Sequence, residues 1–296
     1  MELAGQLLQF FFSGVTNGSI FALVAIGFSI IYRTTQVINF AQGEFVTFGA
    51  LLMYTGYATL GLPIPIAFVL AVLGAMLVGI LLERLAINPV FVRGGSVVVM
   101  IMITLGASIF LRGAALLLWG KDFVPLPPFG KEVTVKWLGA AISSQALWVV
   151  GMAAALVLAI TGLFRFTMVG WAMRACALNR DMAALVGINV RLYVMLAFAL
   201  SAILGGAGGI VMGPITMAHF NLGSALVLKG FTAAVVGGMG SVAGATLGGF
   251  LIGLVDAYAA GLIGSGYRDA VTFGLLLLVL FVRPSGLVGE FQAERI

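Results

Sequence analysis

Residues 17–51 read NGSIFALVAIGFSIIYRTTQVINFAQGEFVTFGAL, and the polar interruption between the two apolar runs of this stretch decides how the chain folds. Each run is apolar enough to form a helix in a bilayer. Between the runs, Asn39, Gln42 and Glu44 fall within six residues. Because lipid cannot satisfy polar groups, these side chains either satisfy backbone groups at a helix start or line a path through the membrane.

The composition of the whole chain is that of a membrane protein. Of its 296 residues, 62% are hydrophobic and only 8% are charged, whereas a soluble domain carries about 25% charged residues. Apolar runs of membrane-spanning length recur from one end to the other, and the 41 glycines suit close helix packing in lipid. We therefore expect residues 1–296 to form one all-α integral membrane domain. Its first span should be retained, since no basic n-region precedes it.

Eight segments are long enough to cross the bilayer as helices, and one apolar segment is too short. The short one, residues 225–237, would reach only about 20 Å as a helix, against a hydrocarbon core of about 30 Å. We expect a half-helix there, which enters the membrane without crossing it. The eight expected spans are residues 8–32, 38–60, 64–82, 96–119, 146–164, 192–213, 242–262 and 266–283.

The arginines predict which ends of the spans are cytoplasmic, since cytoplasmic loops carry an excess of Lys and Arg. Arginines gather in the loops 83–93 and 165–191, and Arg33 and Arg283 fall on the same side by parity. The loop 120–145 mixes lysines with acids and fits an ordered external loop. We expect an external N-terminus and a cytoplasmic C-terminus.

The two halves of the chain carry matching interruptions in opposite orientation. The span that begins at residue 8 starts outside and is followed by an interrupted region, 33–44. The span that begins at residue 192 starts inside and is followed by another, 214–241. This layout predicts an inverted repeat with a transport pathway at its interface.

The first interruption has the spacing of a helix cap. Asn39 followed by Gln42 three residues later resembles a capping box, which predicts a helix from about Phe40. Glu44 then lies near the positive end of the helix dipole. Two interpretations remain: the polar side chains satisfy backbone groups, or the helix start lies inside the membrane and lines the substrate path.

Glycines mark the second interruption. Gly237, Gly238 and Gly240 break the helix after the half-span, and we count them with Asn39, Gln42 and Glu44 as candidate pathway residues. No strand precedes them, so they are not a dinucleotide fingerprint. Small residues at four-residue spacing predict close helix packing, and they are Gly240, Gly244, Gly248, Gly249 and Gly253.

Three charged residues are expected within the membrane, where a charge must be paired or wet. They are Glu44, Arg112 and Asp256. Arg112 can extend its side chain toward the external end, or it can pair with Glu44 or with Asp256. The sequence does not choose among these arrangements.

The internal loop 165–191 is expected to hold a short amphipathic helix. Asn179 is a good cap, Asp181 sits in the first turn and Gly187 can end the helix. Its apolar residues, Met182, Leu185 and Val186, repeat at helical spacing. Such a helix either docks a cytoplasmic partner or lies on the lipid surface.

Several functions are excluded by what the sequence lacks. With one His, one Cys and no clustered carboxylates, it offers neither catalytic machinery nor a metal site. No Walker A motif is present, so the chain cannot hydrolyse ATP itself. Cys176 has no partner for an internal disulfide. The net charge of +5 does not indicate nucleic-acid binding, because it follows the distribution of arginines about a membrane.

Residues 17–51 resemble the N-terminal signature of the permease subunits of branched-chain amino acid ABC importers. Residues 170–213, GWAMRACALNRDMAALVGINVRLYVMLAFALSAILGGAGGIVMG, are similar to the central loop and following span of that family. KGFTAAVVGGMGSVAGATLGGFLIGLVDAYAAG and YRDAVTFGLLLLVLFVRPSGLVG are similar to its C-terminal third. The resemblance covers nearly the whole chain in order.

The resemblance implies partners that the chain itself does not contain. These are a second related permease in a homodimer or heterodimer, two cytoplasmic ATPases that bind ATP and Mg, and a periplasmic substrate-binding protein. It places the chain in a bacterial inner membrane. The segment NRDMAALVGI is similar to the coupling helix of ABC importers, which implies ATPase contact by Asn179, Arg180, Asp181, Ala183, Ala184 and Gly187.

One departure from the family bears on the substrate. The family often reads NFAHGE where this chain reads NFAQGE, and Gln42 cannot titrate as His can. Related permeases are described for urea, short amides and aromatic acids, so these remain alternatives to branched-chain amino acids. Rivals from other classes are a secondary transporter driven by an ion gradient and a passive channel for small polar solutes.

Overall fold

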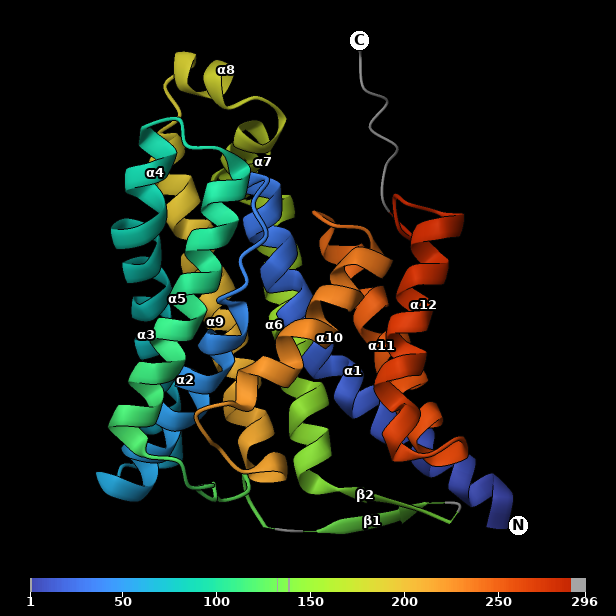
Figure 1. Cartoon of the computed structure of the whole chain (residues 1–296). Coiled ribbons are helices and arrows are strands. Elements are labelled where there is room, and N and C mark those ends of the chain that lie inside the picture. The colour runs from blue at the N-terminus through green and yellow to red at the C-terminus, as the bar shows by residue number, and fades with distance from the viewer. Residues whose placement is uncertain (1, 132, 138, 289–296) are drawn as a thin grey trace.

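A computed structural model describes residues 2–131, 133–137 and 139–288 of the chain as a bundle of helices (Figure 1). Within these residues, seven helices are long and apolar enough to cross a membrane. Turns extend two of them: α3 continues through a π-helical turn, Glu83–Ile87, into α4 (Asn88–Val92), and a 3₁₀ turn, Ser265–Tyr267, precedes α12. The seven are α1 (Glu2–Thr35), α3 (Ile64–Leu82), α5 (Val97–Trp119), α6 (Ser144–Phe166), α9 (Val190–Thr216), α11 (Val242–Leu262) and α12 (Arg268–Val282).

Two shorter helices follow the two interruptions. The half-helix expected at 225–237 is α10 (Leu222–Gly237), and it starts three residues earlier than predicted. The span expected at 38–60 is α2 (Gln42–Tyr54), continued by a π-helical turn, Thr55–Thr59. The helix begins at Gln42, two residues after the predicted start at about Phe40. A separate turn precedes the helix: Asn39 Oδ1 accepts from the Ala41 N–H, and Ala41 has φ −78° and ψ 4°, which is not helical. The Phe40 N–H donates to Thr104 Oγ1 of α5 at 3.2 Å.

The two halves form the expected inverted repeat. The helices α1, α2, α3 and α5 of the first half correspond in order to α9, α10, α11 and α12 of the second. The first helix of each half packs on the third helix of the other half, in the pairs α1–α11 and α9–α3. The second helix of each half packs on the first helix of the other, in the pairs α2–α9 and α10–α1. The central helices α1 and α9 are the most buried. In Figure 1, α2 and α10 both begin near the mid-height of the bundle and run toward opposite ends.

The two short helices touch where they begin. A Cβ atom added to Gly43 would lie 2.5 Å from the carbonyl oxygen of Gly223, and one added to Gly223 would collide with the carbonyl of Gly43. Ordinary contacts of a Cβ atom begin at about 3.4 Å. Only glycine allows α2 and α10 to approach this closely, and their contact lies where the two halves of the repeat meet.

The predicted glycine stripe of α11 serves two neighbours. Gly244 and Gly248 pack against α10, whereas Gly249 and Gly253 pack against α1. Gly240 lies before the helix, in the turn between α10 and α11, at φ +87°. These glycines therefore allow α11 to pack closely against both α1 and the half-helix α10.

The two ends of the bundle differ. The start of α1 lies at one end, beside a hairpin of β1 (Thr134–Trp137) and β2 (Ala140–Ser143), within the segment expected to be a loop at 120–145 (Figure 1). The strands are antiparallel, with Thr134 opposite Ser143. The opposite end holds α4, α7 (Met168–Leu178) and α8 (Arg180–Leu185). The helix α7 was not predicted within the loop 165–191.

Candidate functional site

The polar side chains of the first interruption are buried. Asn39, Gln42 and Glu44 are each at most 1% exposed. Asn39 Oδ1 accepts from the Ala41 N–H at 3.1 Å, so it caps the turn before α2 rather than the first turn of the helix. The Asn39 Nδ2 has no partner among the described residues.

Gln42 does not complete a capping box, so that prediction is wrong. Its amide faces α9 instead: Ser201 Oγ donates to Gln42 Oε1 at 2.5 Å, and Gln42 Nε2 donates to the Ser201 carbonyl at 3.3 Å. A side chain at Gly27 would collide with the Gln42 amide, and Gly205 lies on another side of it. Gln42 therefore fills a space that glycines on α1 and α9 leave open.

Glu44 forms an ion pair with Arg112 of α5, which was one of the alternatives predicted for Arg112. Ser108 Oγ donates to Glu44 Oε1 at 2.8 Å, and the Arg112 guanidinium donates to the same oxygen at 3.1 Å. The second carboxylate oxygen, Oε2, is buried without a partner in the described part of the chain. Arg112 is 35% exposed in its side chain, and its Nε also lacks a partner there.

Asp256 belongs to a different cluster, which the sequence analysis missed. The Arg268 guanidinium binds both carboxylate oxygens of Asp256, and Lys229 Nζ lies 2.6 Å from Asp256 Oδ1 and 3.1 Å from Asp269. Lys229 was visible as a lone cation within the apolar segment 225–237, and that was the available signal. The structure thus separates Asp256 from the Glu44–Arg112 pair.

The two charged clusters occupy corresponding places in the repeat. Each ties a short helix to the last helix of its half: Glu44 of α2 binds Arg112 of α5, and Lys229 of α10 binds Asp269 of α12. The acid and the base exchange places between the halves. Both clusters therefore hold an outer helix to one of the two short helices that meet at Gly43 and Gly223.

The glycine break lies at the far end of α10 from its contact with α2. Gly238 (φ +106°) and Gly240 (φ +87°) need conformations that favour glycine. The Val288 N–H donates to the carbonyl of Gly237 at 3.0 Å, and Gly286 packs against Gly238. The structure does not bring these glycines together with Asn39, Gln42 and Glu44.

The helix α8 is formed as its sequence predicted. Asn179 Oδ1 accepts from the Met182 N–H at 3.0 Å at its start. At its end, the Gly187 and Ile188 N–H groups donate to the carbonyls of Ala184 and Ala183, each at 3.0 Å, with Gly187 at φ +89°. This is a Schellman motif, which requires a left-handed residue at the position of Gly187.

The surface of α8 is apolar and open. Met182, Leu185 and Val186 are 61%, 81% and 76% exposed, whereas Ala183 faces inward. The Arg180 guanidinium lies over the Phe91 ring of α4, 5.0 Å from its centroid. Burial there lowers the pKa of Arg180. A short, firmly capped helix with exposed aliphatic side chains is suited to entering a groove on another protein.

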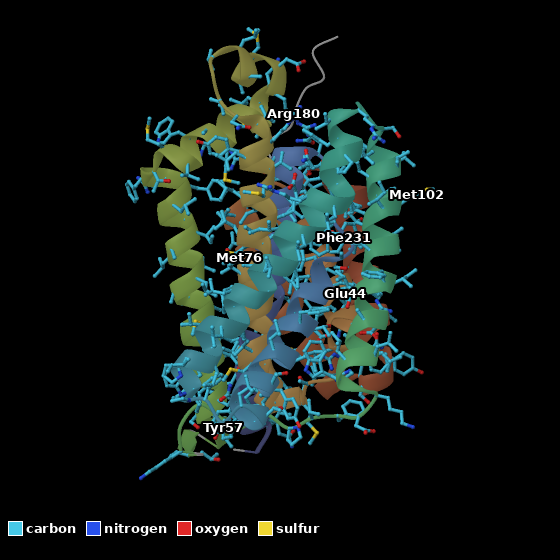
Figure 2. All side chains as sticks on the ribbon, turned by 90° about the vertical axis from the view of Figure 1, so that its left-hand side faces the viewer. Glu44, Tyr57, Met76, Met102, Arg180 and Phe231 are labelled. Carbon is cyan, nitrogen blue, oxygen red and sulfur yellow. The ribbon has the colours of Figure 1, made fainter. Side chains whose placement is uncertain are left out.

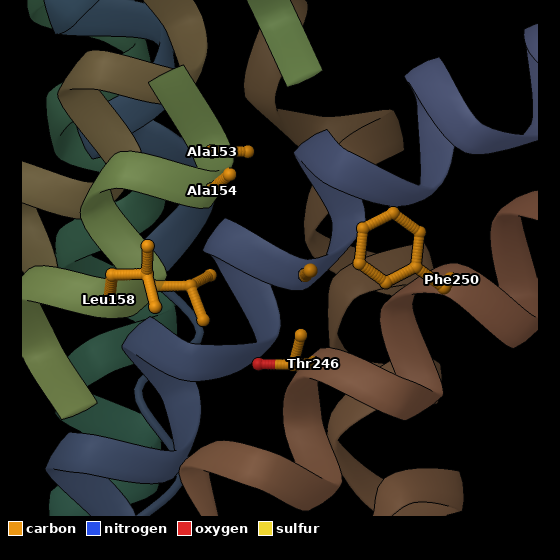
Figure 3. Close-up of a pocket in the computed structure, with 7 residues that line it drawn as sticks. Ala153, Ala154, Leu158, Thr246 and Phe250 are labelled. Carbon is orange, nitrogen blue, oxygen red and sulfur yellow. The ribbon is translucent and has the colours of Figure 1, made fainter. Parts of the chain in front are cut away.

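A surface pocket between α1, α6 and α11 does not suit a polar substrate (Figure 3). Its volume is about 270 Å³. Thr246 brings the single hydroxyl group to a lining that is otherwise apolar. The other lining residues are Ala22, Ala153, Ala154, Val157, Leu158 and Phe250.

Comparison with known proteins identifies the family. Residues 10–280 match the family described as "Branched-chain amino acid transport system / permease component". The chain is 35% identical over 304 residues to the high-affinity branched-chain amino acid transport system permease protein LivH of Escherichia coli (strain K12), covering 98% of this chain and 97% of that protein. It is 34% identical to LivH of Salmonella typhimurium, over 98% and 97% of the two chains. It is 33% identical to BraD of Pseudomonas aeruginosa, over 98% of each chain.

The family model spans most of the chain, and these relatives match it nearly end to end above 30% identity. The seven long apolar helices and the inverted repeat agree with a protein that spans a membrane. The chain therefore belongs to the family of permease components of branched-chain amino acid transport systems.

Proposed function

We propose that this chain is a permease subunit of an ATP-driven ABC importer for branched-chain or related amino acids, and that it is not an enzyme itself. The relatives LivH and BraD are named as branched-chain amino acid permeases, which supports amino acids over urea, amides or aromatic acids as the substrate class. ATP and Mg would be bound by separate ATPase subunits.

The observation that carries this proposal is the helix α8. Its caps hold it in one conformation, and its exposed Met182, Leu185 and Val186 have no cover in the described chain. In the proposed transporter, α8 sits in a groove of an ATPase and moves with it when ATP binds. Asn179 and Gly187 fix the shape of this helix, and Arg180 anchors it to α4.

The remaining partners and the orientation belong to the same proposal. A second permease and a periplasmic binding protein complete the importer, which sits in a bacterial inner membrane. The end of the bundle that carries α8 also holds most of the arginines, which supports a cytoplasmic position for that end and an external N-terminus. These arginines are Arg33, Arg84, Arg93, Arg165, Arg174, Arg180, Arg191 and Arg283.

A secondary transporter would use buried acids as cation or proton sites. Glu44 and Asp256 are each held by a cation of the chain itself, and they lie in separate clusters. Neither cluster is a chain of acids that crosses the bundle. This arrangement favours the ATP-driven importer over transport driven by an ion gradient.

The proposal is tested by disrupting α8 without disturbing the bundle. Leu185→Asp should leave the chain inserted, because Leu185 is 81% exposed, and should abolish ATP-dependent leucine uptake by the assembled importer. Leu60→Asp is the matched control, since Leu60 is 64% exposed and lies near the opposite end of the bundle, just after the π-helical turn that follows α2. Normal uptake by the Leu185→Asp importer would overturn the docking role of α8.

A further inference from the structure

We propose that the Glu44–Arg112 pair, with the neighbouring aromatic side chains of Phe40 and Phe231, recognises the charged groups and the aliphatic side chain of an amino acid during its passage. The inference rests on the proposed function, because it names a recognition site within the proposed permease. It assigns the ammonium group to Glu44, the carboxylate to Arg112 and the apolar side chain to the aromatic pair.

Both members of the Glu44–Arg112 pair keep polar atoms that form no hydrogen bond in the described chain. Glu44 is 1% exposed, and both of its bonds go to Oε1, so Oε2 is buried without a partner in the described chain. One terminal nitrogen of Arg112 donates to both Glu44 and Ser108, and its Nε is unpartnered in the described chain. A guanidinium and a carboxylate that serve only to hold two helices usually meet through two parallel hydrogen bonds.

The other charged cluster supplies a comparison within the same molecule. There Arg268 binds both oxygens of Asp256 through two nitrogens, and Lys229 adds a third bond to the carboxylate. That cluster satisfies its buried acid fully, as a structural ion pair should. Glu44, the buried acid of the first charged cluster, is left with a free oxygen instead.

Two aromatic side chains meet between the turn before α2 and the helix α10. Phe40 is four residues before Glu44 and its ring lies 6.0 Å from that of Phe231, with both side chains half-buried. Figure 2 shows Phe231 and Glu44 near the mid-height of the molecule. The Phe40 N–H donates to Thr104 Oγ1, one turn of α5 before Ser108, whose hydroxyl binds Glu44, so the backbone of Phe40 and the carboxylate of Glu44 contact the same face of α5.

This combination fits an amino acid better than a neutral or singly charged solute. An ammonium group can donate to Glu44 Oε2, and a carboxylate can accept from the unused donors of Arg112. The Phe40 and Phe231 rings offer apolar surface to a branched side chain. Because the substrate would use Oε2 and the free donors of Arg112, it can bind while the bond between Arg112 and Glu44 Oε1 stays in place.

The test uses a cysteine at Val227 as a reporter in the assembled importer without its binding protein. Val227 is half-buried on α10 and lies against Gly43, beside the proposed site. The variant also carries Cys176→Ser, so that Val227→Cys is its single cysteine. With L-leucine at about four times its dissociation constant, a small water-soluble thiol reagent should modify this cysteine at about one fifth of the rate measured without leucine. Leucinamide, which lacks the carboxylate, and 4-methylvalerate, which lacks the ammonium group, should protect far less.

The control and the double variant separate recognition from a structural role. The exposed Thr59→Cys should react at the same rate with and without leucine. Glu44→Gln with Arg112→Gln keeps two side chains that can hydrogen-bond to each other and should abolish protection at Val227→Cys. Protection that survives this double change, or equal protection by all three compounds, would overturn the inference. ATP-dependent uptake by the unmodified importer is measured in parallel, and its absence would instead count against the proposed function.

Discussion

A close contact between the two short helices predicts that alanine at Gly43 will be costly. The added Cβ atom would lie 2.5 Å from the carbonyl oxygen, 2.9 Å from the carbonyl carbon of Gly223 and 3.0 Å from the Val227 Cβ. Two of these neighbours are backbone atoms, which cannot rotate away. Overpacking of this kind costs about 1–3 kcal/mol, and we expect a value near the upper end.

The assay is the thermal stability of the detergent-purified chain, followed by the loss of the monodisperse peak in size-exclusion chromatography. A cost of about 2–3 kcal/mol should lower the Tm by about 3–5 °C in a protein of this size. Gly223→Ala tests the same contact from the other helix, and its overlap with the backbone is greater. It should be at least as destabilising.

The matched control is Gly113→Ala on α5. Nothing lies within 4 Å of a Cβ atom added there, and alanine gains helix propensity of up to about 1 kcal/mol over glycine. The Tm of this variant should be unchanged or raised. If Gly43→Ala and Gly223→Ala behave as Gly113→Ala does, α2 and α10 do not meet as described, and the arrangement of the repeat is wrong.

Three further predictions concern other buried groups. Asp256→Ala leaves Lys229 without its closest partner and should cost about 3–5 kcal/mol, measured as loss of folded protein, whereas Asp269→Ala removes a largely exposed partner and should cost about 1 kcal/mol or less. Gln42→Leu leaves the buried Ser201 hydroxyl unpaired and should lower stability by about 1–3 kcal/mol, with much of the loss recovered by adding Ser201→Ala. Burial raises the pKa of the Cys176 thiol, so maleimide should label the folded chain slowly near neutral pH and faster as the pH rises toward that pKa; labelling as fast as in the denatured chain would contradict the burial.

The sequence predicted the features that depend on local composition. Apolar runs located seven of the eight expected spans, whereas the segment expected at 38–60 forms the shorter α2. The short run at 225–237 correctly indicated a helix too short to cross alone. The cap at Asn179 and the left-handed glycine at Gly187 fixed the limits of α8, because both signals act on their own backbone neighbours.

Features that depend on distant partners could not be predicted in the same way. The partner of the Phe40 N–H, just before α2, is Thr104, 64 residues away on α5. The partner of Gln42 lies 159 residues away, on α9. Lys229 was overlooked because the segment 225–237 is otherwise apolar. A single cation within such a segment indicates that a buried acid lies nearby. The choice of Glu44 as the partner of Arg112 needed the position of α5 against α2.

The most direct test of the account is leucine uptake into proteoliposomes, comparing this chain alone with the complete importer of both permeases, the ATPases and the binding protein. We predict uptake only by the complete importer, only with ATP on the side of α8, and not when Leu185→Asp is introduced. Leucine accumulation by this chain alone, driven by an ion gradient without ATP, would contradict the account.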